Sequence, residues 1–290
     1  MINNLFEFLL KAGLISILMY AFYRIFLDGS TYHTLNRAFL VFLPVFSVLA
    51  PLSKSIDFFK TPNTNSLWIN DFQEGFTNYT QEPASNLQST GIDVFHVLKI
   101  LYFSIVALLL LRFFYRIIRL FLLKKASQKH TSGEITFYVS STVKDAFSFF
   151  RWIIIPAKDL NKAGTNEILE HEKVHAEQWH SIDLILMEIF CITFWFNPFV
   201  IPLRKSLKSV HEYIADREIL QTGTTVESYL RLLVSGLESN VFSGITNQFS
   251  SLTVKKRINM ITKNKSSKLR KFNYFLAIVF SFYILQSFAL

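Results

Sequence analysis

The sequence predicts a mainly α-helical membrane protein with four transmembrane helices and a small cytoplasmic α+β domain between the third and fourth spans. Three observations carry this fold class: long apolar runs, basic segments that flank them, and a polar block that holds strand-like segments and one HExxH motif. The chain has 290 residues, of which 51% are hydrophobic and 31 are phenylalanine. This apolar content is concentrated in long runs with few charges, as is typical of membrane spans.

Four apolar runs are predicted to cross a bilayer, which takes about 20 residues of helix. They are Leu5–Leu27, Ala38–Leu52 (Thr34–Leu52 at its widest), Val94–Leu111 and Phe272–Leu290. The first is expected to be retained, because no basic segment precedes it and no small-residue cleavage site follows it. The third is expected to continue as a helix with Arg112, Arg116 and Arg119 on a basic face beside the membrane.

The charges of the connecting segments predict the orientation. Lys54 to Asp93 holds two basic and five acidic residues, whereas Arg112 to Lys129 holds six basic and no acidic ones, and Lys255 to Lys271 eight and none. Because basic segments stay in the cytoplasm, the loop 54–92 is expected outside, residues 124–271 inside, and both termini outside. The chain therefore divides into a three-span membrane region (1–123), a cytoplasmic domain (124–271) and a last span (272–290). The net charge of +9 is explained by this pattern, so no direct contact with nucleic acid is expected.

The cytoplasmic block begins with two segments rich in aromatic and β-branched residues, Thr136–Ser140 and Trp152–Pro156. Both are predicted strands, and the second is expected to be an edge strand that binds substrate by β-augmentation. A helix is predicted to begin near Asn166, and two more to cover Ser206–Gln221 and Val226–Leu237.

Leu184–Pro202 contains a single acidic residue, Glu188, as its only charge and is long enough to be a fifth span. A crossing there would leave the two halves of the candidate site on opposite sides of the membrane. This segment is therefore predicted to be a buried or membrane-dipping helix, broken near Asn197-Pro198.

The stretch His171-Glu172-Lys173-Val174-His175 is an HExxH motif within a predicted helix. Residues four apart share a helical face, so both imidazoles can reach one metal ion. Glu172 then stands where a carboxylate can activate the metal's water. The motif alone also arises by chance on solvated helices. A single cysteine, Cys191, excludes a thiolate metal cluster.

A third ligand is needed, because a catalytic zinc site usually has three protein ligands and one open position. Glu212 and Asp216 lie four residues apart on a second predicted helix. We expect Glu212 to bind the ion and Asp216 to hold the second nitrogen of a ligand histidine. The oxyanion that forms during hydrolysis has three candidate stabilisers, His180, His211 and Tyr213, among which the sequence does not choose.

These motifs resemble those of the BlaR/MecR-type membrane metallopeptidases, the antirepressors of β-lactam signalling. The matching pieces are HEKVH, Trp195-Phe-Asn-Pro198 and His211-Glu-Tyr-Ile-Ala-Asp216, in this order and between the predicted spans. The resemblance implies a gluzincin-like zinc peptidase domain in a bacterial inner membrane protein, with His171, His175 and Glu212 on zinc and Glu172 as catalytic acid/base. Relatives that sense β-lactams carry a penicillin-binding domain after the last span, whereas this sequence ends at Leu290.

The resemblance also implies partners. They are a protein or peptide substrate, such as a cytoplasmic repressor or the chain itself, and the lipid bilayer; oligomerisation is left open. The basic segment Val254–Lys271 is expected to be an exposed linker and a candidate region for self-cleavage.

Two alternatives compete with this interpretation. One is a membrane metalloprotease similar to the CAAX prenyl proteases, which also combine HExxH with a later ExxxD. The other is a non-catalytic signalling or scaffold subunit with a vestigial zinc site. The intact Glu172 argues against the second alternative, because a structural metal site needs no general base.

Overall fold

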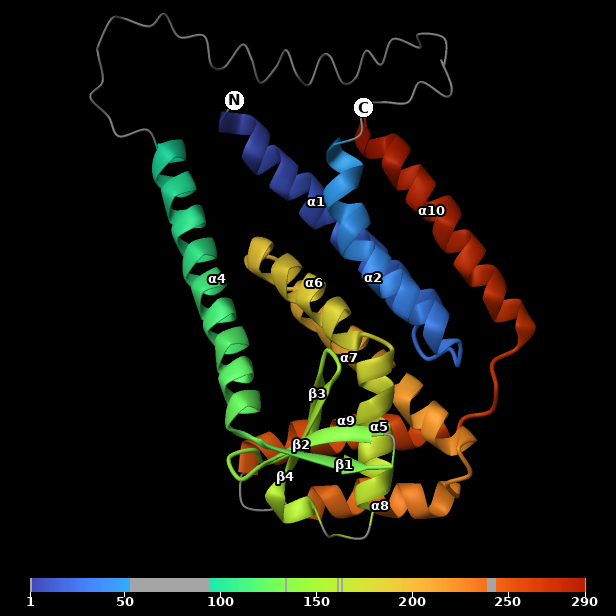
Figure 1. Cartoon of the computed structure of the whole chain (residues 1–290). Coiled ribbons are helices and arrows are strands. Elements are labelled where there is room, and N and C mark those ends of the chain that lie inside the picture. The colour runs from blue at the N-terminus through green and yellow to red at the C-terminus, as the bar shows by residue number, and fades with distance from the viewer. Residues whose placement is uncertain are drawn as a thin grey trace, which may run out of the picture.

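The computed structural model describes residues 2–52, 94–133, 135–160, 162, 164–238 and 244–289 (Figure 1). The predicted outside loop, residues 54–92, lies beyond the described residues. The described α-helices are α1 (Ile2–Phe22), α2 (His33–Leu49), α4 (Val94–Ala126), α5 (Thr165–Glu177), α6 (His180–Thr193), α7 (Val200–Gln221), α8 (Val226–Glu238), α9 (Gly244–Ile261) and α10 (Phe272–Ala289). The strands are β1 (Gln128–Ser132), β2 (Ile135–Ser140), β3 (Phe147–Phe149) and β4 (Trp152–Pro156).

Three described helical segments are long and apolar enough to cross a membrane: Leu5–Leu27, His33–Leu52 and Val94–Ala126. The third runs on through the three arginines, as expected, and α4 has no buried residue. An apolar helix that buries none of its residues in the protein is suited to lipid rather than water. The fourth predicted span is a helix, α10, without a charged residue, and its crossing of the membrane remains a prediction.

The apolar segment predicted over Leu184–Pro202 is two helices that form a hairpin. α6 ends at Thr193 and α7 begins at Val200, so the chain breaks at the predicted place. α7 starts earlier than the predicted Ser206, because Pro202 lies in its first turn, where proline is tolerated. At the tip of the hairpin, the Asn197 side-chain amide donates to Ser16 Oγ (3.0 Å), which ties this turn to α1.

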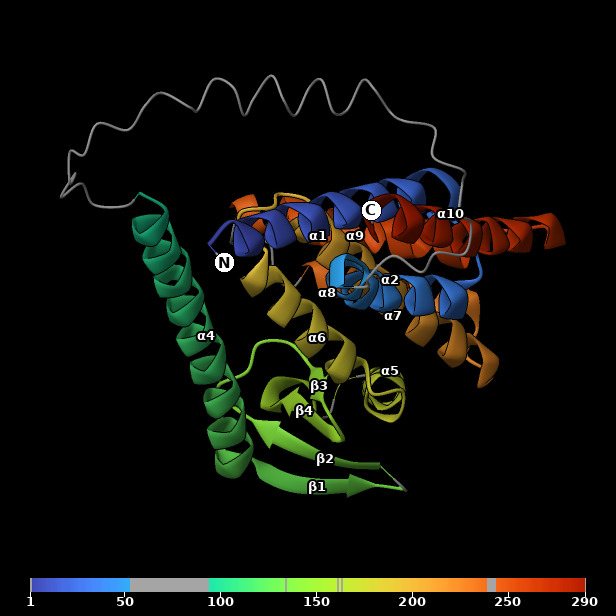
Figure 2. The same cartoon turned by 90° about the horizontal axis from the view of Figure 1, so that it is seen from above.

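The α6–α7 hairpin shares one apolar core with α1, α2 and α10 rather than with the sheet. Its buried side chains pack among those of α1, α2 and α10; they include Met187, Phe190, Phe194, Leu203, Leu207 and Val210. On its other side, Tyr102 of α4 donates to the Thr193 carbonyl (3.0 Å). Seen from above, α6 crosses between the α1–α2–α10 group and the α4–sheet group (Figure 2).

The four strands form a mixed sheet in the order β1-β2-β4-β3. β2 pairs with β1 antiparallel and with β4 parallel, and β3 pairs with β4 antiparallel. The prediction that Trp152–Pro156 is an edge strand is therefore wrong. Its run of apolar residues is typical of an interior strand with buried faces, and the edges are the shorter or more polar β3 and β1.

Helix α5 packs on the sheet through a small second core. Leu169 and Ala176 of α5 lie against Phe137 and Ile153 of the sheet. The helix begins at Thr165, one residue before the predicted Asn166. Trp179 then adopts a left-handed backbone conformation (φ 57°), and this turn sends the chain back into α6.

The predicted exposed linker Val254–Lys271 is partly wrong, because its first eight residues belong to α9. Within Val254–Lys271, only residues 262–267 are irregular. Two hydrogen bonds also hold these residues to the segment before α2. The Ser266 hydroxyl accepts from the Thr31 amide (3.0 Å), and the Ser266 amide donates to the Thr31 hydroxyl (2.9 Å).

Candidate metal centre

Helices α5 and α7 bring the three predicted ligands together. His171 Nε2 lies 3.2 Å from His175 Nε2, and the Glu212 carboxylate lies 3.3 Å from His171 Nε2 and 3.6 Å from His175 Nε2. These three side chains form a group able to hold a metal ion. The two histidines are successive on one face of α5, and the carboxylate approaches them from α7.

These separations fit one tetrahedral ion. Zinc bonds to imidazole nitrogen and carboxylate oxygen are about 2.0–2.2 Å long, so two ligands of a tetrahedral ion lie roughly 3.4 Å apart. The observed 3.2–3.6 Å bracket that value. Two imidazoles and one carboxylate are also a donor set used by catalytic zinc, which keeps its fourth position for water.

His171 is fixed by a chain of polar contacts. Its Nδ1 lies 3.0 Å from the Tyr229 hydroxyl, and that hydroxyl donates to Asp216 (2.8 Å). Asp216 is predicted to hold a histidine nitrogen directly, but its own oxygen is 3.8 Å from Nδ1, and the hydrogen-bonded connection runs through Tyr229 instead. With Nδ1 donating to Tyr229, the lone pair of Nε2 faces the other ligands, as metal binding requires.

Arg257 of α9 links the same groups and was missed in the sequence. Its guanidinium pairs with Asp216 through two nitrogens, donates to the Tyr229 hydroxyl (3.1 Å) and lies 3.0 Å from the Glu212 carboxylate. Its side chain is 14% exposed. Arg257 thus neutralises the buried carboxylate of Asp216 and the partly buried carboxylate of Glu212, a candidate ligand, and it does so from the segment predicted to be a linker.

His175 has a different support. Its Nδ1 lies 2.6 Å from Nδ1 of His180, which the turn after α5 returns to the site. The His180 ring stacks on the ring of His211, with centroids 4.0 Å apart. His211 in turn lies 2.9 Å from Asp183, and Asp183 pairs with Arg37 of α2 (2.6 Å). This second chain runs from a candidate ligand to a helix long enough to cross the membrane.

Glu172 is buried, and its environment favours proton transfer. Burial, with the nearby charge of Glu212, raises the pKa of its carboxyl, whereas His171, a hydrogen bond from Ser148 and Arg257 oppose that rise. Ser148 belongs to the edge strand β3, so the candidate base contacts the sheet edge. A carboxyl whose pKa is raised binds a proton more readily than an exposed one, as a group that accepts and returns a proton requires.

A family model described as BlaR1 peptidase M56 matches residues 35–261. The chain belongs to this family. The match covers more than half of the 290 residues and includes α5 and α7 with all three candidate ligands. The expected resemblance to the BlaR/MecR type is confirmed, and the apolar helices agree with a membrane metallopeptidase. A search of curated proteins finds no match.

The two imidazoles of this M56 peptidase differ electrostatically. Burial opposes protonation of His171, but its hydrogen bond and attraction to Glu212 outweigh burial and raise its pKa. For His175, burial and the neighbouring His171 lower the pKa to about 3. Glu212 has a pKa well below its usual range, because the His171 hydrogen bond and nearby positive charges outweigh its burial. His175 is therefore neutral, as a ligand must be, whereas His171 is the more easily protonated of the two, so protons compete with a metal ion chiefly at His171.

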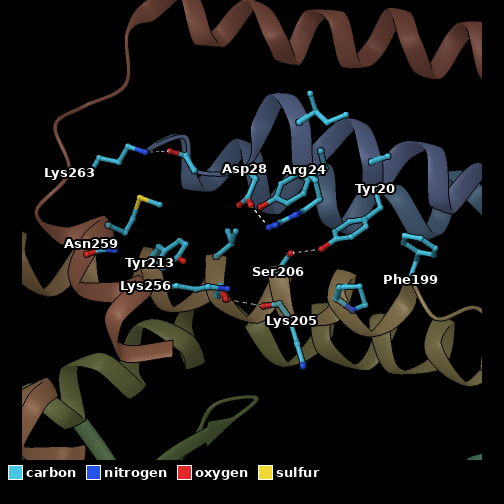
Figure 3. A pocket seen from close by; sticks show the side chains of 18 residues that line it. Tyr20, Arg24, Asp28, Phe199, Lys205, Ser206, Tyr213, Lys256, Asn259 and Lys263 are labelled. Carbon is cyan, nitrogen blue, oxygen red and sulfur yellow. Dashed lines mark hydrogen bonds and ion pairs between the residues drawn. The ribbon is translucent and has the colours of Figure 1, made fainter. Parts of the chain in front are cut away.

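The three candidate stabilisers of the oxyanion have other contacts in this M56 peptidase. His180 supports His175, His211 pairs with Asp183, and Tyr213 lies beside His33 with ring centroids 5.4 Å apart. Tyr213 also lines a pocket that contains none of the three candidate ligands (Figure 3). Nothing in the described contacts gives Tyr213 a link to the ligand cluster, so we assign it no role there.

Proposed function

We propose that this protein is a membrane-anchored zinc endopeptidase of the BlaR/MecR type. It would hydrolyse a peptide bond in a cytoplasmic regulator or in its own chain, as a step of transmembrane signalling. The observation that carries the proposal is the meeting of His171, His175 and Glu212 at the spacing of a tetrahedral ion, with Glu172 buried beside them. Membership of the M56 family supports it.

The chain's own residues supply the proton transfers. When bound, a zinc ion would lower the pKa of a water molecule toward about 7 and polarise the scissile carbonyl. Glu172 would accept the proton of the attacking water as the new carbon–oxygen bond forms. It would then deliver that proton to the amine nitrogen as the carbon–nitrogen bond breaks. Tyr229 and Asp216 would hold the His171 ring in place, and His180 would hold the ring of His175.

Strand β3 replaces Trp152–Pro156 as the proposed binding edge for the substrate. It lies at the end of the sheet, packs next to α5 and contributes Ser148 to Glu172. A substrate segment that added to β3 would pass beside the candidate base, with main-chain hydrogen bonds that are indifferent to sequence.

The proposed topology has four spans with the peptidase part in the cytoplasm of a bacterial inner membrane protein. Both termini lie at the end of the molecule opposite the sheet, which agrees with an even number of crossings (Figure 1). Within the predicted cleavage region Val254–Lys271, self-cleavage would fall in residues 262–267, because the residues just before them are helical. Release of their contacts with Thr31 would have to precede cutting.

The alternatives are weaker. The family match is to the BlaR1 peptidase rather than to a prenyl protease. A non-catalytic scaffold would bind zinc without needing a buried carboxylate beside the ligands. Bound zinc without chelator-sensitive cleavage would favour the scaffold.

The proposal is tested by comparing new protein N-termini in membranes of cells that express the wild type, Glu172→Gln or Glu170→Gln. Glu170 lies on the same helix but pairs with Lys173 at a partly exposed position, so it is the matched control. We expect zinc content to stay the same in all three and cleavage to fall by about 10²–10⁴ only in Glu172→Gln. Cleavage by Glu172→Gln at the wild-type rate would refute the role of this residue.

A further inference from the structure

Two turns near the metal centre each hold a bulky residue in the left-handed region of the backbone. Among the described residues, Phe150 (φ 51°) and Trp179 (φ 57°) are the only residues other than glycine with a positive φ. Their rings lie edge to face, with centroids 6.2 Å apart. Bulky side chains are rare in this region, and such a conformation persists only where the surrounding structure holds it. The meeting of the two residues therefore points to a contact that fastens both turns.

Phe150 stands where glycine is the more usual residue. Strands β3 and β4 pair Phe149 with Trp152, so Phe150 and Arg151 form a two-residue hairpin loop. The common loops of this length have a positive φ at the first position, which glycine adopts without strain. The backbone amide of Phe150 donates to the Ser181 hydroxyl (2.8 Å), and this bond joins the sheet to the start of α6.

The start of α6 is a rigid anchor for this bond. Ser181 lies in the first turn of the helix and is 7% exposed. The chain on both sides of it is fastened to α2, because Arg37 donates to the Gln178 carbonyl (2.7 Å) and pairs with Asp183 (2.6 Å). Further along, α6 contributes to the apolar core that it shares with α1, α2 and α10. Strand β3 is therefore the partner that the bond holds in place.

Strand β3 has few other contacts of its kind. It has three residues and lies at the edge of the sheet, so β4 is its one partner among the described strands. It lies beside the start of α6 in both views (Figure 1 and Figure 2). Its middle residue, Ser148, donates a hydrogen bond to Glu172. Because Ser148 is two residues before Phe150, the bond to Ser181 fixes the strand close to its contact with the candidate base.

We propose that Ser181 is a positioning residue of the peptidase: it anchors β3 to α6, and β3 in turn orients Glu172 through Ser148. The inference rests on the proposed function. Ser181 makes no described hydrogen bond to Glu172 or to the candidate ligands, so it acts through the strand and not on the reacting atoms. The same anchor fixes the edge at which a substrate segment is proposed to pair.

Three substitutions in the full chain test the proposal. Ser181→Ala removes the acceptor of the Phe150 amide, and Ser181→Thr keeps it. Ser140→Ala is the matched control, because the Ser140 hydroxyl also accepts a backbone amide, that of Thr142 (3.3 Å), and Ser140 is 8% exposed. Thermal unfolding shows that each variant is folded. The measurements are hydrogen exchange of residues 147–151, zinc content, and the rate at which Glu172-dependent N-termini appear in membranes.

We expect Ser181→Ala to speed exchange at Phe150 and to lower the cleavage rate by about 10–100-fold, because a small misplacement of a reacting group slows a reaction by about this factor. Its zinc content should stay that of the wild type. Ser181→Thr should restore slow exchange and cleavage together, and Ser140→Ala should keep both. Loss of zinc in step with cleavage would mean general disruption and would overturn the positioning role. Slow exchange in Ser181→Thr without restored cleavage would overturn it as well.

The test separates the role of Ser181 from the proposed function. If the wild type forms no Glu172-dependent N-termini, the peptidase itself is refuted. If the wild type cleaves and Ser181→Ala cleaves equally fast, only the role of Ser181 is refuted.

Discussion

The two histidines of the metal centre lie one turn apart on α5, yet they are anchored to different parts of the molecule. His171 is held by Tyr229, Asp216 and Arg257, which come from α8, α7 and α9. His175 is held by His180, whose stacked neighbour His211 leads through Asp183 to Arg37 of α2. One candidate ligand is thus supported by the helices that follow the site, and the other is connected to α2, which belongs to a segment long and apolar enough to span a membrane.

The largest expected effect is a loss of folding stability when the residues that support His171 are disturbed. Arg257→Gln removes the positive charge between Glu212 and Asp216, whose side chains are 29% and 2% exposed. Leaving buried carboxylates without their counter-charge costs about 3–5 kcal/mol. Denaturant unfolding of the metal-free protein in detergent measures this loss. Arg231→Gln, in an exposed pair with Glu227, is the control and is expected to change stability by less than about 0.5 kcal/mol. Equal effects of the two substitutions would contradict the account.

The next largest effect is a loss of zinc affinity in a variant that keeps the fold. Tyr229→Phe keeps the ring but removes the hydroxyl between His171 and Asp216. Loss of such a partner lowers metal affinity by about 10–100-fold, and competition titration with a chromophoric chelator measures it. Tyr213→Phe, which lies beside His33, should leave the affinity unchanged. The support role fails if both variants bind zinc like the wild type.

The pH dependence of zinc binding sharpens the comparison between the two histidines. The pKa of His171 is raised, so below that pKa a proton must leave before the metal binds, whereas His175, with a pKa of about 3, is already neutral. Zinc affinity should therefore fall about tenfold for each unit that the pH drops below the His171 pKa. A fall of a hundredfold per unit would mean that both imidazoles carry competing protons.

The smallest effect on zinc affinity is expected when the residues that support His175 are disturbed. Arg37→Gln removes the ion pair with Asp183 and the contact with the Gln178 carbonyl (2.7 Å), but His180 still bonds to His175. Zinc affinity should fall only several-fold, less than for Tyr229→Phe. Arg24→Gln, in an exposed pair at the end of the first span, is the control. An Arg37→Gln effect larger than that of Tyr229→Phe would reverse the order of the two supports.

Local patterns predicted much of the fold and the ligand cluster. HExxH and ExxxD each depend on helical spacing within a few residues, so His171, His175, Glu212 and Asp216 could be found without knowing the fold. The helix break at Asn197 and the run of arginines in α4 are equally local signals. The break in the apolar segment followed from proline chemistry alone.

What could not be predicted depends on contacts far apart in sequence. Tyr229 and Arg257 meet Asp216 across 13 and 41 residues, and neither carries a motif. The unbroken apolar run of β4 is compatible with an interior strand, but its parallel pairing with β2, which is not its neighbour in sequence, is visible only in the fold. Eight basic residues without an acidic one between Lys255 and Lys271 indicated a solvated linker, and only the fold shows that Arg257 faces two carboxylates.

The central claim is that α5 and α7 hold one metal ion between them. X-ray absorption of the zinc-loaded, detergent-solubilised full chain tests it most directly. The account predicts one zinc per chain with two imidazoles and oxygen ligands at about 2.0–2.1 Å, and a marked loss of bound zinc in Glu212→Ala. A sulfur ligand, a single imidazole, or full zinc content in Glu212→Ala would contradict it.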